Sequence, residues 1–313
     1  MKILILGAGA IGSLFGGFLA KAGHKVCFLG RKTNNDAIRN NGLKIDGIWG
    51  DHLITDISCF ESLNQIIDQG IKEFDYVIVS VKSYDTESIV SEYINKFPVL
   101  APFISLQNGL GNIEKIENLV GAENTIGGRV ITGVEYLNPG HIRVTVSASD
   151  PVLGAINKSS ANIAEKAAKM FTAAGIRTGV TDNIQTCIWE KVLYNCALNA
   201  LSTIININYG RLLSSPAARD LILNIIIEIY NVIHKENIIV NFETPQDYTE
   251  HLFGKLIPLT FNHHPSMLQD IHHNKRTEID ALNGAIVKIS KKHNLSSPYN
   301  STIVNILKAK EQL

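Results

Sequence analysis

Short apolar runs alternate with stretches of helical spacing along the first part of the chain. The strand-like runs are Lys2–Leu6, Lys25–Leu29, Tyr76–Val81 and Phe103–Leu106. Helix-compatible spacing fills the segments Ala10–Ala22, Asn34–Asn41, Leu63–Gln69 and Thr86–Asn95. Four-residue apolar runs between helices are typical of a parallel sheet that is covered on both faces. The pattern therefore predicts an α/β domain with a doubly wound sheet.

The pattern then changes twice. Gly42–Ile54 favours a hairpin, and beyond Gly127 the chain becomes more purely β, with strand-like runs at Arg129–Val134, His141–Val146 and Pro151–Ala155, a helix at Ser160–Ala174 and a short strand at Gly175–Val180. From about Asn183 strand signals vanish, and helices are expected at Ile184–Ile205, Pro216–Glu236, Pro245–Leu256, Glu278–His293 and Tyr299–Lys310. We therefore expect two domains, an α/β domain over 1–182 and an all-α domain over 183–313.

Composition excludes several classes of partner. The 29 basic and 29 acidic residues balance, so no global field attracts nucleic acid or an anionic membrane. The most apolar stretch, Leu221–Ile233, is too short to span a bilayer and is expected to be a buried helix. The chain begins on a strand-like run without a leader pattern, and its cysteines show no framework spacing, so we expect a cytoplasmic protein with free thiols.

The first strand-like run leads into a glycine-rich loop. Gly7-Ala8-Gly9-Ala10-Ile11-Gly12 reads G-x-G-x-x-G between a strand and a helix, with a second strand following. In such a loop the first glycine permits the tight turn, the second admits the pyrophosphate, and the third allows close packing of helix and strand. Free N–H groups at the helix start would bind the phosphates. The loop predicts a Rossmann-type dinucleotide site, and the alternative is a tight turn with no ligand.

The residues after the second strand bear on the identity of the dinucleotide. Enzymes that use NAD commonly carry an acidic residue here, whereas this chain has Gly30-Arg31-Lys32. A guanidinium can bind a 2′-phosphate through two hydrogen bonds, and a carboxylate would repel it. We therefore expect NADP, held in part by Arg31. The alternative is that Arg31 and Lys32 form a solvated loop.

Polar residues form a stripe along the first helix of the second half. Lys191, Asn195 and Asn199 follow i, i+4, i+8 spacing on an otherwise apolar helix. Polar groups on a buried face need partners, and a polar substrate would provide them. A solvated stripe on a surface helix explains the spacing equally well.

Two further segments carry candidate residues. Ser266 is a plausible N-cap with Gln269 at the capping-box position, which competes with a ligand-binding role for the serine. The downstream helix is expected to carry Glu278. The pairs His263/His264 and His272/His273 lack an acid or thiol at ligand spacing, so no metal site is expected.

Taken together, these motifs resemble those of the ketopantoate reductase family (2-dehydropantoate 2-reductases) over essentially the whole chain. The matching pieces are the G-A-G-A-I-G loop with Arg31, V-S-V-K ending at Lys82, L-Q-N-G with Asn108, W-E-K-x-x-x-N-C-x-x-N, and S-M-L-Q-D followed by E-I-D-x-L-N-G. The resemblance implies NADPH-dependent reduction of 2-dehydropantoate to (R)-pantoate in the pantothenate and coenzyme A pathway. It also implies a helical domain of the 6-phosphogluconate dehydrogenase C-terminal type. The helical domain could dimerise or form its own core, so a monomer and a homodimer are both expected.

The resemblance assigns roles to individual residues. Lys191 matches the catalytic lysine and Glu278 its acidic partner, while Asn195, Asn199 and Ser266 match substrate-binding residues. Asn108 matches an asparagine beside nicotinamide and substrate, and Lys82 a lysine near the cofactor. A lysine ammonium, with an ordinary pKa of about 10.4, is charged at neutral pH and can act as a general acid toward the developing alkoxide.

One position departs from the family pattern. Where the family often has N-G-E-L, this chain has Tyr209-Gly210-Arg211-Leu212, so an asparagine that helps bind substrate elsewhere is a tyrosine here. Asn206 or Asn208 could take its place. The departure keeps one alternative open: a reductase of another 2-oxo acid, or an opine-type or polyol dehydrogenase, on the same scaffold. A separate alternative is an NADP(H)-sensing protein without turnover, against which the presence of Lys191, Glu278 and Asn108 argues.

Overall fold

The computed structural model describes residues 1–313, and these form two compact units. Unit 1 comprises Met1–Gln107 and Asn112–Ile184, and unit 2 comprises Asn108–Gly111 and Gln185–Leu313. The boundary at Ile184 lies close to the 182/183 boundary expected from the change in pattern. The short segment Asn108–Gly111 joins the helical unit although it lies within the α/β half of the sequence.

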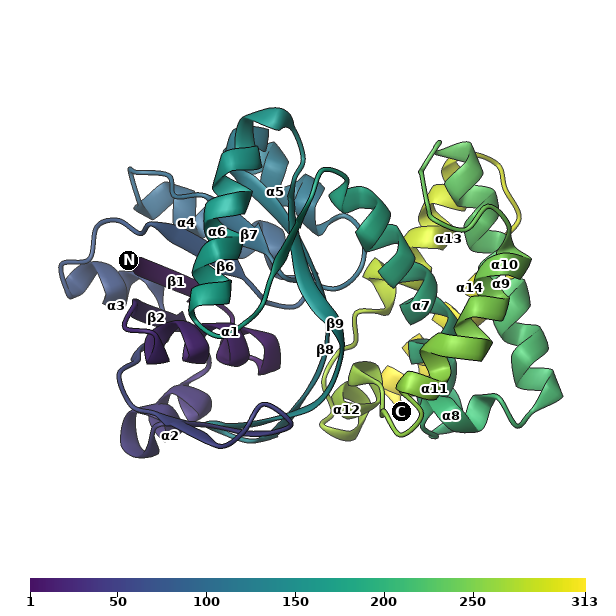
Figure 1. The fold of residues 1–313 in the computed structure, drawn as a ribbon, viewed down its shortest axis with the longest axis horizontal. Coiled ribbons are helices and arrows are strands. Elements are labelled where there is room, and N and C mark those ends of the chain that lie inside the picture. The colour runs from purple at the N-terminus through teal and green to yellow at the C-terminus, as the bar shows by residue number, and fades with distance from the viewer. The chain divides into compact units, whose positions relative to one another are not determined.

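Unit 1 is built on one mixed sheet (Figure 1). Its strands are β1 (Lys2–Leu6), β2 (Lys25–Leu29), β3 (Leu43–Gly47), β4 (His52–Ile54), β5 (Ser58–Phe60), β6 (Tyr76–Val79), β7 (Phe103–Ser105), β8 (Thr125–Asn138), β9 (His141–Ala155) and β10 (Gly179–Thr181). The order β5-β2-β1-β6-β7-β8 is parallel throughout, with the crossover point between β1 and β6. Ligands of such sheets bind beyond the carboxyl ends of the strands at this point.

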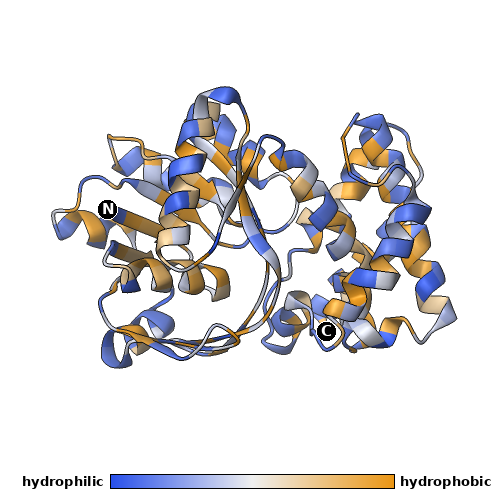
Figure 2. Ribbon diagram, viewed as in Figure 1, coloured by the Kyte–Doolittle hydropathy of each residue, from blue (hydrophilic) through white to orange (hydrophobic).

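Helices cover both faces of this sheet, as the alternation predicts. They are α1 (Ala10–Lys21), α2 (Lys32–Asn41), α3 (Leu63–Asp68), α4 (Thr86–Lys96), α5 (Asn112–Val120) and α6 (Ala161–Ala173). Side chains from α1 and α6 share one buried cluster with the sheet, and side chains from α3, α4 and α5 share the other. Figure 2 shows the central strands as apolar and the helices as mixed, which is the distribution that two buried sheet faces require.

The sequence pattern missed parts of unit 1. The hairpin expected at Gly42–Ile54 is confirmed as the antiparallel pair β3–β4, but β5 and α5 were not predicted. The runs beyond Gly127 belong to two long antiparallel strands, β8 and β9, whose pairing contains several register shifts. The strand expected at Gly175–Val180 is shorter and begins at Gly179.

Unit 2 is helical and has its own apolar core. Its helices are α7 (Ile184–Ile205), α8 (Tyr209–Leu212), α9 (Pro216–Lys235), α10 (Pro245–His251), α11 (Ile257–Leu259), α12 (Ser266–His272), α13 (Asn283–Lys292) and α14 (Pro298–Gln312), with a π-helical turn at Leu252–Leu256 and a 3₁₀ turn at Ile279–Ala281. The single helix predicted for Glu278–His293 is wrong. Leu282, at φ −106° and ψ −110°, interrupts it and leaves Glu278 outside any α-helix.

A buried polar network fixes the start of α14. The carboxylate of Glu228 on α9 is 5% exposed and accepts hydrogen bonds from the backbone N–H groups of Tyr299 and Asn300. The Asn300 amide donates to the same carboxylate, and Asn283 on α13 donates to Asn300. An acid at a helix N-terminus binds the unpaired N–H groups and complements the helix dipole. The network therefore anchors α14 against α9 and α13.

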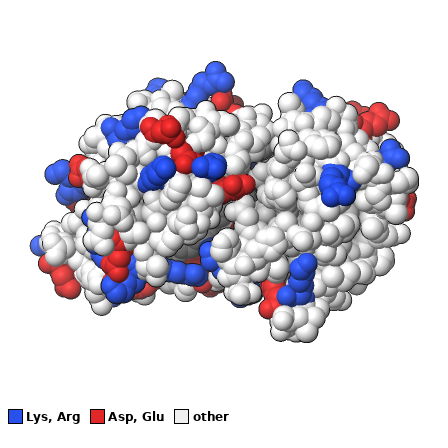
Figure 3. Space-filling model, turned by 90° about the horizontal axis from the view of Figure 1, so that it is seen from below, with Lys and Arg blue, Asp and Glu red and all other residues white.

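The lengths of the helices and the charges on one face of the molecule can be compared with the composition. No helix is long and apolar enough to cross a bilayer. On the face shown in Figure 3, basic and acidic side chains are interspersed and neither sign gathers into a large patch. This distribution agrees with the balanced composition.

Candidate functional site

The glycine loop has the geometry that a dinucleotide requires. Gly7 has φ +104°, and a Cβ there would lie 2.7 Å from the backbone nitrogen of Val81. A Cβ on Gly12 would lie 2.0 Å from the carbonyl oxygen of Gly7. A Cβ on Gly9 would meet nothing within 4 Å, so this position faces open space. Two glycines are thus required by the packing of the loop itself, and the third leaves room for a ligand.

The start of α1 supplies the donors at this open position. Gly9 is the N-cap residue and no side chain caps the helix. The first N–H groups of a helix have no intrahelical acceptor, and together with the dipole they form an anion site. Ala8, Ala10 and Ile11 are the remaining loop residues expected to surround the pyrophosphate. The residues present fit a dinucleotide phosphate, and the parallel-sheet crossover places the loop where such ligands bind.

Two polar side chains missed by sequence reasoning hold this loop in shape. Ser80, after β6, donates from its hydroxyl to the carbonyl oxygen of Gly7 at 2.8 Å. Asn34 on α2 is 6% exposed and donates to the carbonyl oxygen of Ala8 at 2.9 Å. Its Oδ1 accepts from the Gly140 N–H and the Tyr136 hydroxyl. An asparagine in the polar run K-T-N-N-D gives no signal of burial, because its partners lie 26, 102 and 106 residues away in the chain.

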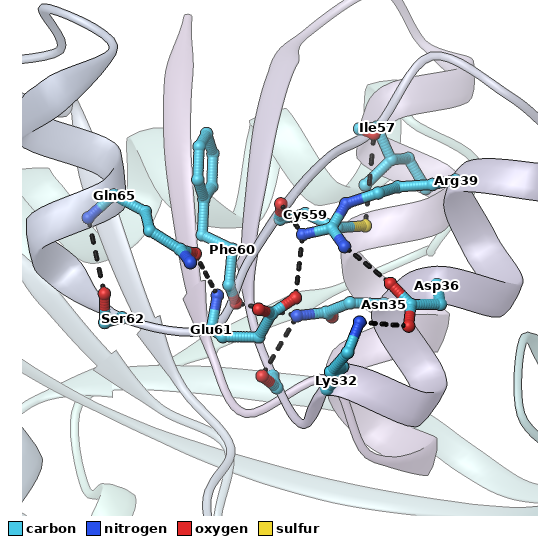
Figure 4. A network of polar contacts seen from close by, with 11 residues as sticks. Lys32, Asn35, Asp36, Arg39, Ile57, Cys59, Phe60, Glu61, Ser62 and Gln65 are labelled. Atoms are coloured by element: carbon cyan, nitrogen blue, oxygen red, sulfur yellow. Dashed lines mark hydrogen bonds and ion pairs between the residues drawn. The ribbon is translucent and has the colours of Figure 1, made fainter.

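The two basic residues after β2 differ in their surroundings. Lys32 donates to Asp36 at 2.7 Å, one helical turn further along α2, and Arg39 also binds Asp36 (Figure 4). Arg31, the N-cap residue of α2, is exposed, and its guanidinium makes no hydrogen bond or ion pair. Of the two cations, Arg31 is therefore the one whose charge is available to a ligand.

The two remaining candidates from the α/β half lie in loops. Lys82 is half-buried in the turn that follows β6 and precedes α4. Asn108 follows β7 and belongs to the segment grouped with unit 2, where the Leu110 N–H donates to the carbonyl oxygen of Ala281 at 2.8 Å. A Cβ on Gly109 would lie 2.4 Å from that same carbonyl oxygen. The close approach explains why glycine follows Asn108.

The stripe along α7 is buried rather than solvated. Asn195 and Asn199 are 7% and 4% exposed, and Lys191 is half-buried. The amide of Asn195 makes no hydrogen bond with the protein. Neither polar atom of this amide is fully buried, so both remain accessible to an external ligand.

Ser266 is joined to this stripe through Asn199. The Asn199 amide donates to the Ser266 hydroxyl at 3.4 Å, and its Oδ1 accepts from the Met267 N–H at 3.3 Å. The prediction that Ser266 is an N-cap is wrong: Pro265 occupies that position, Ser266 is the first helical residue, and its side chain caps nothing. Asn199 satisfies the start of α12 instead, which leaves the hydroxyl of Ser266 for another partner.

Glu278 lies in the segment between α12 and α13, directly before the 3₁₀ turn. It is 9% exposed, and the preceding Thr277 is 1% exposed. Unit 2 thus contains all six polar residues assigned to substrate and catalysis: Asn108, Lys191, Asn195, Asn199, Ser266 and Glu278.

The side chain of Tyr209 is buried in the core of unit 2. It is 2% exposed, its ring packs edge-on against Tyr194 and His263, and burial raises its pKa well above the ordinary value. Asn208 caps α8 by accepting from the Arg211 N–H, and Asn206 adopts φ +61° after the end of α7. The tyrosine has therefore become part of the core, and both neighbouring asparagines end or begin helices.

The paired histidines do not gather with other ligands. No group of three His, Cys, Asp or Glu side chains is placed to hold a metal ion. Burial lowers the pKa of His263 to about 4, so it is neutral at physiological pH, and His273 binds the carbonyl oxygen of Gln269.

The chain matches a known protein family over most of its length. The family model described as ketopantoate reductase PanE/ApbA matches residues 3–158, and its C-terminal counterpart matches residues 183–311. The chain belongs to the ketopantoate reductase family. The 2-dehydropantoate 2-reductase of Aquifex aeolicus is 39% identical over 319 residues, which cover 99% of this chain and 97% of that protein.

Solved structures of the family share the fold over the whole chain. A ketopantoate reductase of Ralstonia eutropha is 28% identical with a TM-score of 0.88, covering 100% of this chain and 99% of its own. D-mandelate dehydrogenase with NADH and anilino(oxo)acetate is 27% identical with a TM-score of 0.87, again covering 100% and 99%. Members of this fold therefore bind a nicotinamide cofactor, and this ketopantoate reductase family member is an oxidoreductase.

Proposed function

We propose that this protein reduces 2-dehydropantoate to (R)-pantoate with NADPH. The observation that carries the proposal is the 39% identity to a 2-dehydropantoate 2-reductase across 99% of the chain. The amide of Asn195, one turn from Lys191 on α7, supports it independently, because its polar atoms are accessible and have no protein partner, so a polar substrate can bind them. A cytoplasmic location belongs to the same proposal.

The cofactor would be held by the residues of unit 1. Backbone N–H groups at the start of α1, from Gly9 onward, would bind the pyrophosphate and Arg31 the 2′-phosphate, with Lys82 nearby. When bound, NADPH supplies the hydride for C2 of the 2-oxo acid. The exposed and unpaired guanidinium of Arg31 favours NADPH over NADH.

The residues of unit 2 would bind and protonate the substrate. Lys191 would stabilise the developing negative charge on the C2 oxygen and donate a proton to it. Glu278 would orient the ammonium or accept a hydrogen bond from the substrate hydroxyl. Ser266 and Asn108 would bind the carboxylate without adding charge, while Asn195 would bind a further oxygen and Asn199 would hold Ser266 in place.

A reductase of a different 2-oxo acid is the second candidate. It is favoured by the similarity to D-mandelate dehydrogenase and by the burial of Tyr209, which removes a polar group that the family often has at this position. An NADP(H)-sensing protein would need neither Lys191 nor Glu278.

The test is the initial rate of NADPH oxidation with a panel of 2-oxo acids, repeated with NADH. We expect the highest kcat/KM with 2-dehydropantoate and NADPH. A higher value with an aryl 2-oxo acid such as phenylglyoxylate would favour the second candidate. NADPH binding without oxidation by any member of the panel would favour the sensor.

A further inference from the structure

The segment that carries Glu278 is held by side chains of the C-terminal helix. Oε1 of Glu311, in the last turn of α14, accepts two hydrogen bonds from Thr277, from the backbone N–H at 2.7 Å and from the hydroxyl at 2.5 Å. The Thr277 hydroxyl in turn accepts from the N–H of Ile279 at 3.3 Å. Glu311 thereby binds the residue before Glu278 directly and holds the residue after it through the Thr277 hydroxyl.

A second contact from α14 reaches the same segment but is weaker. Lys308 and Arg276 bind Asp280 at 2.6 Å and 3.1 Å, and although burial opposes ionisation, these hydrogen bonds lower the pKa of that carboxyl. All three side chains are about half-exposed, and exposed pairs contribute little. Thr277 is 1% exposed and Glu311 is half-buried, so the charge-assisted bonds between them are less exposed to water and are stronger.

The helix that carries Glu311 is itself anchored at both ends. Glu228 binds the first N–H groups of α14, as described above. At the other end Lys310 donates to the carbonyl oxygen of Thr203 at 3.2 Å, on the helix that carries Lys191. The last turn of α14 therefore contacts both the α7 helix and the Glu278 segment.

We propose that Glu311 is a positioning residue that holds the carboxylate of Glu278 in place through Thr277. The proposal rests on the proposed function, which makes Glu278 a participant in the reaction. Misplacement of reacting groups by about 1 Å can cost two orders of magnitude in rate.

The side-chain chemistry allows a sharp test. Both bonds use one oxygen of Glu311, so Glu311→Gln keeps the acceptor, Glu311→Asp moves it back by one methylene, and Glu311→Ala removes it. We expect kcat for 2-dehydropantoate to fall about 10-fold in Glu311→Ala, to fall less in Glu311→Asp, and to stay near wild type in Glu311→Gln. The KM for NADPH should stay unchanged in all three.

Two controls separate positioning from general stability. Glu236→Ala removes another paired carboxylate of unit 2, which binds Lys292 and His293, and should leave kcat unchanged. In a Glu278→Ala background, Glu311→Ala should cause no further loss, because its effect passes through the missing carboxylate. A further loss of the same factor would show that Glu311 acts elsewhere and would overturn the proposal.

Amide hydrogen exchange over residues 276–282 gives a readout that needs no turnover. Glu311→Ala should speed exchange there relative to wild type and Glu311→Gln. Unchanged exchange would contradict the proposal even if the enzyme is active. If wild type fails to reduce 2-dehydropantoate while exchange responds as expected, the proposed function fails and the holding of the segment by Glu311 stands.

Discussion

The proposed cofactor site of unit 1 uses the backbone of one contiguous segment, Gly7–Gly12, whereas the proposed substrate site of unit 2 uses polar side chains from four separate segments. The loop needs glycines at fixed spacing, because a Cβ at Gly7 or Gly12 would collide with backbone atoms. The helical unit needs α7, α12, the Glu278 segment and Asn108 to be held by contacts such as Asn199–Ser266 and Thr277–Glu311. A site built from backbone groups can therefore be recognised from a local sequence motif. A site built from side chains of separate segments depends on the tertiary structure.

The largest effect that separates the two regions is expected from Lys191→Ala. Loss of the proton donor should lower kcat by about 10²–10⁴, while the Kd for NADPH stays at the wild-type value. Steady-state kinetics and NADPH fluorescence titration measure the two quantities. Lys291→Ala, on α13, should change neither. Near wild-type turnover in Lys191→Ala would contradict the assignment of Lys191 as the general acid.

Arg31→Ala should alter the choice of cofactor. Loss of charge-assisted hydrogen bonds to the 2′-phosphate should weaken NADPH binding by about 10- to 100-fold and leave NADH binding nearly unchanged. Lys32→Ala is the matched control, because Lys32 is paired with Asp36 and should affect NADPH much less. Equal losses of NADPH affinity in the two variants would contradict the proposal that Arg31, and not Lys32, binds the 2′-phosphate.

Gly9→Ala should weaken cofactor binding without destabilising the fold. The added methyl group meets no protein atom within 4 Å, so the melting temperature should stay unchanged, while NADPH affinity falls by about 10-fold. Gly254→Ala adds a methyl group at another open position and should not affect NADPH binding. Undiminished affinity in Gly9→Ala would place the pyrophosphate away from this loop.

A smaller, pH-dependent effect on stability is expected from Asp46 in unit 1. The hydrogen bond from Arg143 holds the pKa of the buried Asp46 carboxyl well below its usual range, and His141 donates a further bond. A lowered pKa in the folded state stabilises the protein above the ordinary carboxyl value of about 4, and this contribution is lost as pH falls below it.

Asp46→Asn should therefore lower the urea midpoint at pH 6, and its difference from wild type should shrink at pH 3. Asp51→Asn, in the exposed turn of the same hairpin, is the control. A difference that stays constant between pH 6 and pH 3 would show that the ionisation of Asp46 contributes nothing.

The contrast between the units also explains what sequence alone could predict. The apolar alternation located β1, β2, α1 and α7, because buried strands and long helices carry their own periodicity. It missed β5, a three-residue strand. It also extended a helix back through Glu278, although Asn283-Gly284, directly after the break at Leu282, is a dipeptide typical of turns.

The contacts that hold the site residues in place could not be predicted from the local sequence pattern. Ser80 and Asn34 bind loop carbonyls from distant segments, and Glu311 lies 34 residues from Thr277 in the chain. Nothing in the composition around these residues distinguishes them from solvated polar positions. Tyr209 marked the departure from the family pattern, but only the structure shows that its ring is packed inside the helical core.

The most direct test of the proposed activity is product analysis after reaction of 2-dehydropantoate with a limiting amount of NADPH. The account predicts (R)-pantoate, without its enantiomer, in an amount equal to the NADPH consumed. Absence of pantoate, or NADPH consumption without a matching amount of it, would contradict the proposal that this family member is a 2-dehydropantoate reductase.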